Sequence, residues 1–279
     1  MITPTPNYDR SIARLTSAYK DAVTAILSEL ERMDITNMDR AMTTAALSEV
    51  SRILTSLNAE SAAWVAQNVP IAARDGVARA VLALGVVESL EDAQKLVRMT
   101  RTNSAMVAAA IADTQADLLA VTQNIDRRVK AAVRKAAADS MRANMAAGIN
   151  GRRTINRDTL ASMRKTLGDS VNTGIIDAAG RRWKPEVYVD MLTRTKMMQA
   201  HNDATINEAL ARDVQYGLIS RHGATDKCRL YEGKVVKLTP DAPGAYPYVG
   251  ALPRNEIFHP NCRHLVSPVR RPETIEGGT

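Results

Sequence analysis

The chain has 279 residues, a mass of 30.3 kDa and a net charge of +7, with 45% hydrophobic and 24% charged residues. These proportions exclude a disordered chain and permit one large domain or two smaller ones. Aromatic residues make up only 4%, whereas the helix-favouring residues Ala, Leu, Met and Arg are abundant. Two cysteines do not make a disulfide scaffold, so we expect folding in a reducing cytoplasm.

No targeting or membrane segment is predicted. The N-terminal sequence MITPTPNYDR lacks the basic start and the apolar run of a signal peptide. The longest apolar segment, 77–87, contains Arg79 and is shorter than the roughly 18 apolar residues that a membrane span needs. We therefore expect no contact with a membrane.

The first hundred residues carry apolar side chains at steps of three and four, which predicts successive helices. This spacing covers 12–30 and recurs over 42–57. Pro70 is expected to break the helical pattern and to separate a short third segment from a helix over 71–85, because proline lacks a backbone N–H.

A long helix is expected over 104–147, after a helix start at Ser89. Ile111, Leu118 and Ile125 stand seven residues apart, a spacing typical of bundles and coiled coils. The apolar stripe is thin and rich in alanine, so it needs a close partner helix. That partner could come from this chain or from another subunit.

Two glycine-containing connectors follow, at 147–156 and 174–183, with a shorter helix between them over 157–170. Pro185 suits the first turn of a further helix, which we expect to end at Gly217.

After Gly217 the sequence changes to short β-like runs, a loop rich in Pro and Gly over 239–260, and a closing strand over 262–269. The sequence thus predicts a mostly α protein. It has an elongated helical N-terminal body with long helices, followed by a small C-terminal α+β module rich in β-hairpins.

The positive charge is concentrated in 127–165, which holds 11 basic residues against Asp139 and Asp158. Such a stripe predicts contact with nucleic acid, although a solvated helix face or a face that docks on an acidic protein has the same pattern. The candidate binding residues are Arg127, Arg128, Lys130, Arg134, Lys135, Arg142, Arg152 and Arg153.

All four histidines and both cysteines lie within 201–264, and the segment 259–264 reads HPNCRH. Cysteine and histidine are the ligands that zinc prefers. Cys262 and His264 would face the same way on a strand, with His259 across a Pro-Asn turn from them. The predicted zinc ligands are Cys228, His259, Cys262 and His264, with His222 or Asp226 as substitutes.

Other chemistries use the same residues. His259, Asn261 and His264 could form a His-Asn-His nuclease centre, and Cys228 could be a nucleophile with a histidine base. Cys228 and Cys262 could form a disulfide in an oxidising medium. A structural clasp that pins the C-terminal strand to a hairpin over 226–236 is the simplest alternative.

Four motifs occur in order along 174–268: Gly180, Arg181 and Trp183, then Arg194 and Thr195, then Cys228 with Glu232, Gly233, Lys234 and Val235, then Asn261, Cys262, Arg263 and His264. They resemble motifs of the minor capsid and head-morphogenesis proteins of tailed bacteriophages, the relatives of the phage Mu F protein and the phage minor capsid protein 2 group. One Cys, and not a Cys-x-x-Cys pair, stands near position 228, which weakens a zinc site taken from cysteine-richer relatives.

The resemblance implies a virion structural protein and no enzyme. It implies a place near the portal, after a stage in the host cytoplasm, with roles in head assembly, DNA packaging or DNA delivery. The implied partners are the portal protein, the major capsid protein or both, and packaged DNA. The long helices add self-association as a further expectation. We expect no cofactor, with zinc at the Cys and His residues as the alternative. The implied structural motif residues are Gly180, Trp183, Arg194, Thr195, Gly233, Asn261 and Arg263.

The predicted organisation has four parts. These are an N-terminal helical region over 1–103, a long basic helix and its connector over 104–173, a module like that of the phage Mu F protein over 174–269, and a flexible tail over 270–279.

Overall fold

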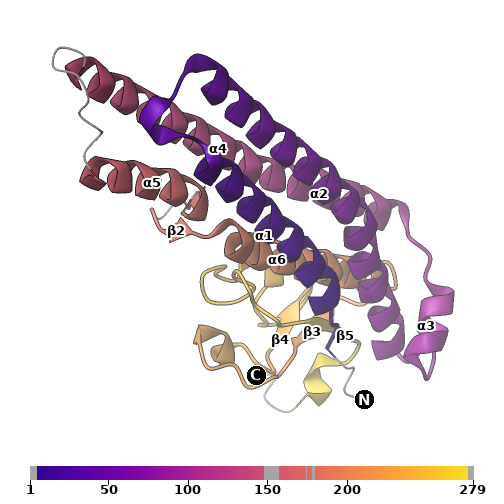
Figure 1. The fold of residues 1–279 in the computed structure, drawn as a ribbon. Helices are drawn as coiled ribbons and strands as arrows, with labels where there is room; N and C mark the ends of the chain where they lie inside the picture. Colours follow the sequence, from indigo (N-terminus) through magenta and orange to yellow (C-terminus); the bar gives the residue numbers. More distant parts are fainter. Residues whose placement is uncertain (1–4, 148–156, 174, 178–179, 276–279) are drawn as a thin grey trace. The chain divides into compact units, whose positions relative to one another are not determined.

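The computed structural model describes residues 5–147, 157–173, 175–177 and 180–275. The described part is mostly helical, with a small β-containing module towards the C-terminus, and this confirms the predicted fold class (Figure 1). The chain divides into two compact units. The sheet unit takes the described residues of Met1–Ile12, Val65–Thr114 and Met191–Thr279, and the helical unit takes those of Ala13–Trp64 and Gln115–Asp190.

The helices account for most of the chain. They are α1 Asp9–Arg32, α2 Arg40–Ala83, α3 Leu90–Leu96, α4 Arg101–Ala147, α5 Arg157–Asn172 and α6 Pro185–Leu210, with short 3-10 helices η1 Ile35–Asn37, η2 Lys227–Leu230, η3 Val249–Ala251 and η4 Pro272–Thr274. The long helix expected over 104–147 is confirmed as α4. The N-cap at Ser89 is also confirmed, because its side chain accepts a hydrogen bond from the Asp92 N–H.

The break expected at Pro70 is wrong. Helix α2 continues through Pro70, although a proline inside a helix removes one backbone hydrogen bond and costs about 3 kcal/mol. Val69, Ala72 and Ala73 are all buried next to it. Since helix stability in proteins comes mostly from packing of a buried face, this burial offsets the cost of the proline.

The end expected for the last helix is also wrong, because α6 ends at Leu210 and Gly217 lies in a strand. Asp213 adopts a left-handed φ of 57°, and the Val214 N–H donates to the Ala209 carbonyl as the chain turns away. A Cβ at position 217 would lie 2.6 Å from the Val266 side chain. Glycine therefore permits close packing inside the sheet here.

Two small antiparallel sheets complete the fold. In the helical unit, β1 Ile175–Ile176 pairs with β2 Arg182–Trp183. In the sheet unit, β3 Tyr216–Ile219 lies between β4 Val235–Lys237 and β5 Val266–Val269. The clasp hypothesis is therefore corrected in its pairing, because the C-terminal strand pairs with β3 and not with the segment over 226–236.

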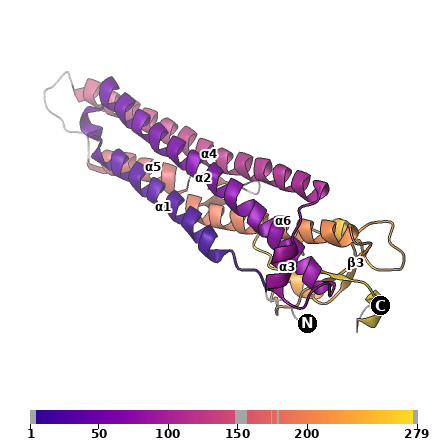
Figure 2. The same cartoon turned by 90° about the vertical axis from the view of Figure 1, so that its right-hand side faces the viewer.

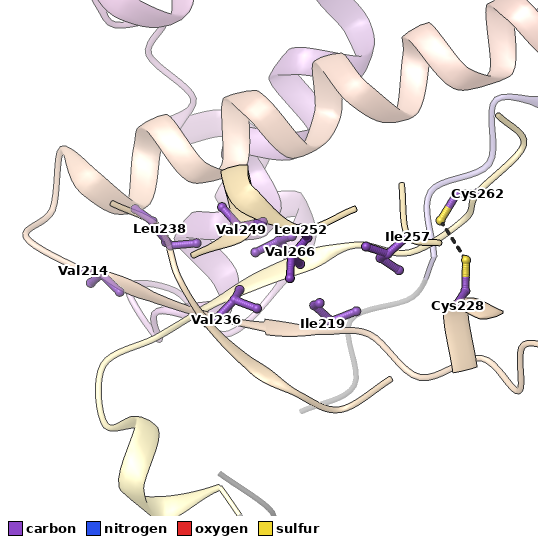
Figure 3. Packing of buried hydrophobic residues seen from close by; sticks show 11 residues of the cluster. Val214, Ile219, Cys228, Val236, Leu238, Val249, Leu252, Ile257, Cys262 and Val266 are labelled. Carbon is purple, nitrogen blue, oxygen red and sulfur yellow. Dashed lines mark hydrogen bonds between the residues drawn. The ribbon is translucent and has the colours of Figure 1, made fainter. Parts of the chain in front are cut away.

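Helix α6 lies against this three-stranded sheet, and the apolar core of the module fills the space beneath the helix (Figure 3). Both cysteines belong to this core. Its buried residues are Ala209, Val214, Ile219, Cys228, Val236, Leu238, Val249, Leu252, Ile257, Cys262 and Val266.

A close approach of α2 and α6 also stabilises the sheet unit. The Thr205 hydroxyl donates to the Gly76 carbonyl at 3.0 Å. A Cβ on Gly76 would lie only 2.2 Å from the carbonyl oxygen of His201. The absence of a side chain at position 76 therefore lets the two helices pack at this distance.

The core of the helical unit is built around Tyr19, which is fully buried. Its hydroxyl accepts a hydrogen bond from Ser61 at 3.2 Å and donates to the Leu118 carbonyl at 3.5 Å, so it links α1, α2 and α4. A bond of 2.5 Å from the Thr122 hydroxyl to the Asn58 side chain adds a second link between α2 and α4. These two helices run side by side in both views (Figures 1 and 2).

By length and composition alone, α4 could cross a membrane, with an 18-residue window of mean hydropathy 1.3 between Arg101 and Arg142. We did not identify this window as a candidate membrane span from the sequence. Core helices of soluble proteins pass the same test when they are mostly buried, whereas 28% of this window is buried; the buried side chains of α4 include Leu118, Val121 and Ile125.

The segment expected to be a flexible tail, 270–279, is described up to residue 275. It contains the turn η4, in which Pro272 is buried.

Candidate metal centre

Helix α6 positions the HPNCRH segment through two side chains. The Asn202 amide donates to the His264 carbonyl at 3.0 Å and accepts from the Val266 N–H at 3.2 Å, so it holds the chain on both sides of residue 265. The Thr195 hydroxyl accepts from the Asn261 N–H at 3.1 Å. The turn and the start of β5 are therefore fixed against a rigid helix.

The HPNCRH segment turns sharply before β5. Asn261 has a φ of 65°, a left-handed conformation that asparagine tolerates better than most residues, and Phe258 has a φ of 55°. The Cys262 N–H donates to the His259 carbonyl at 2.9 Å across the turn. This turn directs the side chains of His259, Cys262 and His264 towards one region.

Cys228 reaches the same region from η2. The Asp226 carboxylate accepts a hydrogen bond from the Cys228 N–H at 3.0 Å and caps this short helix. After η2 the chain returns to the sheet through Gly233, which has a φ of 74°. A Cβ on Gly233 would lie 2.1 Å from the guanidinium of Arg221, so no larger residue fits without a shift.

The four predicted zinc ligands form two groups that share Cys228, with Cys262 and His264 in one group and His259 in the other. The Sγ atoms of Cys228 and Cys262 are 3.7 Å apart, with both thiols free and buried (Figure 3). Nε2 of His259 lies 2.9 Å from the Cys228 sulfur, and Nδ1 of His264 lies 3.2 Å from the Cys262 sulfur. Residues that are up to 36 positions apart in the sequence thus place two sulfur atoms and the His264 nitrogen within 4.8 Å of one another, with the His259 nitrogen against the Cys228 sulfur.

Glu232 lies behind His264. Its carboxylate accepts hydrogen bonds from the backbone N–H groups of His222 at 2.8 Å and Ala224 at 3.0 Å, and lies 3.3 Å from Nε2 of His264. The two backbone N–H groups, followed by His264, lower the pKa of Glu232 from 4.5 to about 2. This carboxylate is therefore ionised at neutral pH and accepts from His264.

His222 and Asp226, the alternative zinc ligands, also lie at the site. Nε2 of His222 is 3.3 Å from Nδ1 of His264, and an Asp226 oxygen is 3.2 Å from Nε2 of His259. Three overlapping sets of potential ligand atoms result, namely Cys228, Cys262 and His264, then His222, Glu232 and His264, then Asp226, Cys228 and His259.

The surroundings of Cys228 disfavour its ionised thiolate form. Burial, the neighbouring Cys262 thiol and the Asp226 carboxylate all raise the pKa of the Cys228 thiol well above its usual value. Nucleophilic attack requires the thiolate, which is scarce at neutral pH when the pKa is raised. Nε2 of His259 lies within hydrogen-bonding distance of this thiol.

The His-Asn-His arrangement is not assembled as a nuclease centre. His259 and His264 each direct one ring nitrogen at a thiol. Asn261 is exposed, and its backbone N–H is used by Thr195. The geometry places cysteine, and not asparagine, between the two histidines.

A cavity of about 360 Å³ adjoins Cys262. Residues of α6 and of the loop before β5 line it, and these include His259, Cys262 and His264. The ligand atoms therefore border open space.

The other motif residues serve the two units in different ways. In the helical unit, Gly180 turns the chain with a φ of 78°, and the Trp183 indole donates to the Asp177 carboxylate at 2.9 Å. In the sheet unit, Arg194 forms an ion pair with Asp9. Arg263 is exposed and lines a second cavity with the same two residues.

The residues predicted to bind nucleic acid lie on α4, apart from Arg152 and Arg153, which lie outside the described residues. The exposed ones are Arg127, Arg134, Lys135 and Arg142, whereas Arg128 and Lys130 are half-buried. Intrahelical ion pairs hold Lys130 to Asp126, and Lys135 and Arg142 to Asp139. Within the described part of the chain, no carboxylate pairs with Arg127 or Arg134.

Sequence reasoning missed Asn202 and the contact of Glu232 with His264. Asn202 follows a histidine on a helix and carries no pattern that announces a bond to a strand about 60 residues later. Glu232 stands in the Cys228-to-Val235 motif, which was the available signal, but its role as an acceptor depends on the turn at Gly233.

The sequence matches one family model, described as phage minor capsid protein 2, over residues 29–271. No similar curated protein and no similar solved structure was found. The matched range includes most of both units and all four motifs. The chain therefore belongs to the phage minor capsid protein 2 family and is a structural component of the bacteriophage virion.

Proposed function

We propose that this protein occupies a position near the portal of a tailed-phage head, where it assists head assembly, DNA packaging or DNA delivery. The observation that carries the proposal is the family match over residues 29–271, which extends across the helical and the sheet units. On this proposal the protein is made in the host cytoplasm and acts by binding other head proteins, without catalysing a reaction.

An exposed apolar face on α4 supports a role in assembly. Leu119 is 44% exposed, and Ala105, Ala108, Ala112 and Ala116 are exposed on the same helix. Small side chains allow a partner helix to approach closely. We propose that this face binds the portal protein, the major capsid protein or a second copy of this chain.

Quantification of the protein in purified virions tests the structural role, and we expect a fixed small copy number per particle. Absence from virions would contradict it. Heads assembled by a phage that lacks its portal gene then test the position, because we expect them to lack this protein. Retention of the full amount in portal-free heads would contradict the place near the portal while leaving the structural role intact.

A second candidate function is DNA binding by α4, and the exposed side chains of Arg127 and Arg134, with which no described carboxylate pairs, favour it. Phosphate contacts release counterions, so the affinity for DNA should fall steeply with salt. Reversing the charge of Arg127, Arg128, Arg134 and Lys135 should abolish that affinity. Reversal of Arg14, Arg32, Arg40 and Arg52, four arginines that are exposed on α1 and α2, changes the net charge by the same amount and is the matched control.

DNA cleavage is the outcome that would revive the nuclease alternative. We expect intact DNA after incubation of the purified protein with Mg²⁺ or Zn²⁺. Cleavage that is lost in His259→Ala and kept in Arg127→Glu would instead assign catalysis to the HPNCRH segment.

A further inference from the structure

We infer that Cys228, His259, Cys262 and His264 bind one Zn²⁺ ion, which joins η2 to the turn before β5. The inference rests on the atoms of this cluster and is independent of where the protein lies in the virion. Two thiols and two imidazoles form a ligand set that favours zinc among the common divalent ions.

The spacing of the sulfur atoms fits tetrahedral coordination. Two thiolates at about 2.3 Å from a tetrahedral zinc ion lie about 3.8 Å apart. The Sγ atoms of Cys228 and Cys262 are 3.7 Å apart. The nitrogen-to-sulfur distances of 2.9 and 3.2 Å are shorter than the corresponding edge of about 3.6 Å. Cys228, Cys262 and His264 already lie within 4.8 Å of one another, whereas His259 shares such a group with Cys228 and Asp226, so binding of the ion requires the His259 imidazole to turn towards the other three ligands.

The tautomer of His259 leaves a nitrogen free for a metal. Its Nδ1 lies 2.8 Å from the Pro260 carbonyl oxygen, which can only accept, so Nδ1 carries the proton. The lone pair of Nε2 then points at the Cys228 sulfur and lies 3.2 Å from an Asp226 oxygen. A cation at this position relieves the repulsion between that lone pair and the carboxylate.

The tautomer of His264 likewise leaves one ring nitrogen unprotonated. Its Nε2 lies 3.3 Å from the Glu232 carboxylate and donates to it, which leaves the lone pair of Nδ1 towards the Cys262 sulfur. A carboxylate behind a ligating histidine fixes the ring and its tautomer in many zinc sites. The backbone N–H groups of His222 and Ala224 hold this carboxylate in place.

His222 and Asp226 are assigned to the surroundings of the ion and not to its ligands. The Asp226 side chain caps η2 through the Cys228 N–H. The His222 side chain is about one-third exposed, and its Nε2 contacts His264, whereas both cysteines are buried. The adjoining cavity gives the ion a path to His259, Cys262 and His264.

The test uses the full-length, untagged protein, purified under reducing conditions and analysed for metals. We expect one zinc ion per chain. Replacement by Co²⁺ should give the intense visible bands and the thiolate-to-cobalt charge-transfer band of a tetrahedral site, a readout that needs no variant. Cys228→Ser, Cys262→Ser, His259→Ala and His264→Ala should each lose the metal or these bands, and Glu232→Gln should weaken binding about 10- to 100-fold.

His222→Ala is the matched control, because it removes a neighbouring imidazole and should keep one zinc per chain. Protein that carries no zinc and gives no cobalt bands would overturn the inference, as would a Cys228–Cys262 disulfide in freshly purified protein. Loss of metal in His222→Ala with retention in His259→Ala would overturn the assigned ligand set.

Discussion

The helical unit and the sheet unit are stabilised by different means. In the helical unit, α1, α2 and α4 satisfy their own backbone hydrogen bonds and pack through apolar faces around Tyr19. In the sheet unit, strands of three or four residues are joined by long loops. Specific polar contacts, such as those of Asn202 and Glu232, hold these loops in place.

This difference explains where the scarce residues lie. A long helix gains stability from each added turn, so alanine and leucine suffice for it. A three-stranded sheet of this size buries little apolar area, and small modules commonly need cross-links to compensate. All histidines and cysteines of the chain lie in the sheet unit, and both tryptophans, Trp64 and Trp183, lie in the helical unit. Tryptophan fluorescence and histidine NMR signals therefore report on the two units separately.

Truncation of the central aromatic side chain should break the helical unit. We expect Tyr19→Ala to lower the free energy of unfolding of this unit by about 3–5 kcal/mol, because it leaves a cavity in the core. Denaturant unfolding followed by tryptophan fluorescence measures the effect. Tyr19→Phe, which keeps the ring and loses the bonds to Ser61 and Leu118, should cost only about 1 kcal/mol. Equal losses in both variants would contradict apolar packing as the main contribution.

Removal of metal should affect only the sheet unit. If zinc is bound, a chelator removes a stabilisation of about 4 kcal/mol at free zinc 1,000 times above the dissociation constant. The histidine NMR signals should then broaden or shift at a lower temperature, while the fluorescence transition stays unchanged. In metal-free protein, Cys262→Ala should cost about 1–3 kcal/mol through lost packing alone. A chelator effect on the fluorescence transition would contradict separate stabilisation of the two units.

A pair of glycine substitutions compares helix packing in the two units. Gly76→Ala should destabilise the sheet unit by about 1–3 kcal/mol, since its Cβ would collide with the His201 carbonyl of α6. A Cβ on Gly168, which lies on α5 in the helical unit, would meet none of the described neighbouring atoms within 4 Å. Gly168→Ala should stabilise that helix by about 0.5–1 kcal/mol. Thermal unfolding of both variants, each followed by the signal of its own unit, measures the difference.

Much of the fold follows from local patterns in the sequence. The seven-residue spacing of Leu118 and Ile125 predicted α4, and the capping oxygen of Ser89 predicted the start of α3. The prediction failed where tertiary packing overrides local preference. Pro70 remains inside a helix because its neighbours are buried. Gly217 does not end a helix but occupies a strand position at which Val266 leaves no space for a side chain.

The candidate site was predicted in part. Residue type and spacing were enough to select Cys228, Cys262 and His264, whose ligand atoms lie within 4.8 Å of one another, and His259, which contacts Cys228, because few other side chains of the chain favour the same chemistry. The contacts that orient the site could not be predicted. They depend on α6 crossing β5 at Asn202, which is a property of the packed module and of no local segment.

The smallest expected effect is a pH dependence confined to the sheet unit. Burial lowers the pKa of His201 below its usual 6.5, although hydrogen bonding to Asp75 acts in the opposite direction. Below pH 6.5 the unfolded chain takes up a proton at this position that the folded unit resists. The stability that His201 contributes is therefore complete above this pH and decreases as the pH falls.

The measurement uses chelator-treated protein, so that loss of metal cannot contribute to the pH dependence. We expect histidine NMR to show a falling unfolding temperature between pH 6.5 and 5, and His201→Asn to flatten this slope relative to wild type. The fluorescence transition should not change over the same range, because the helical unit contains no histidine. A parallel fall in both transitions would show that the two units do not respond independently to protonation.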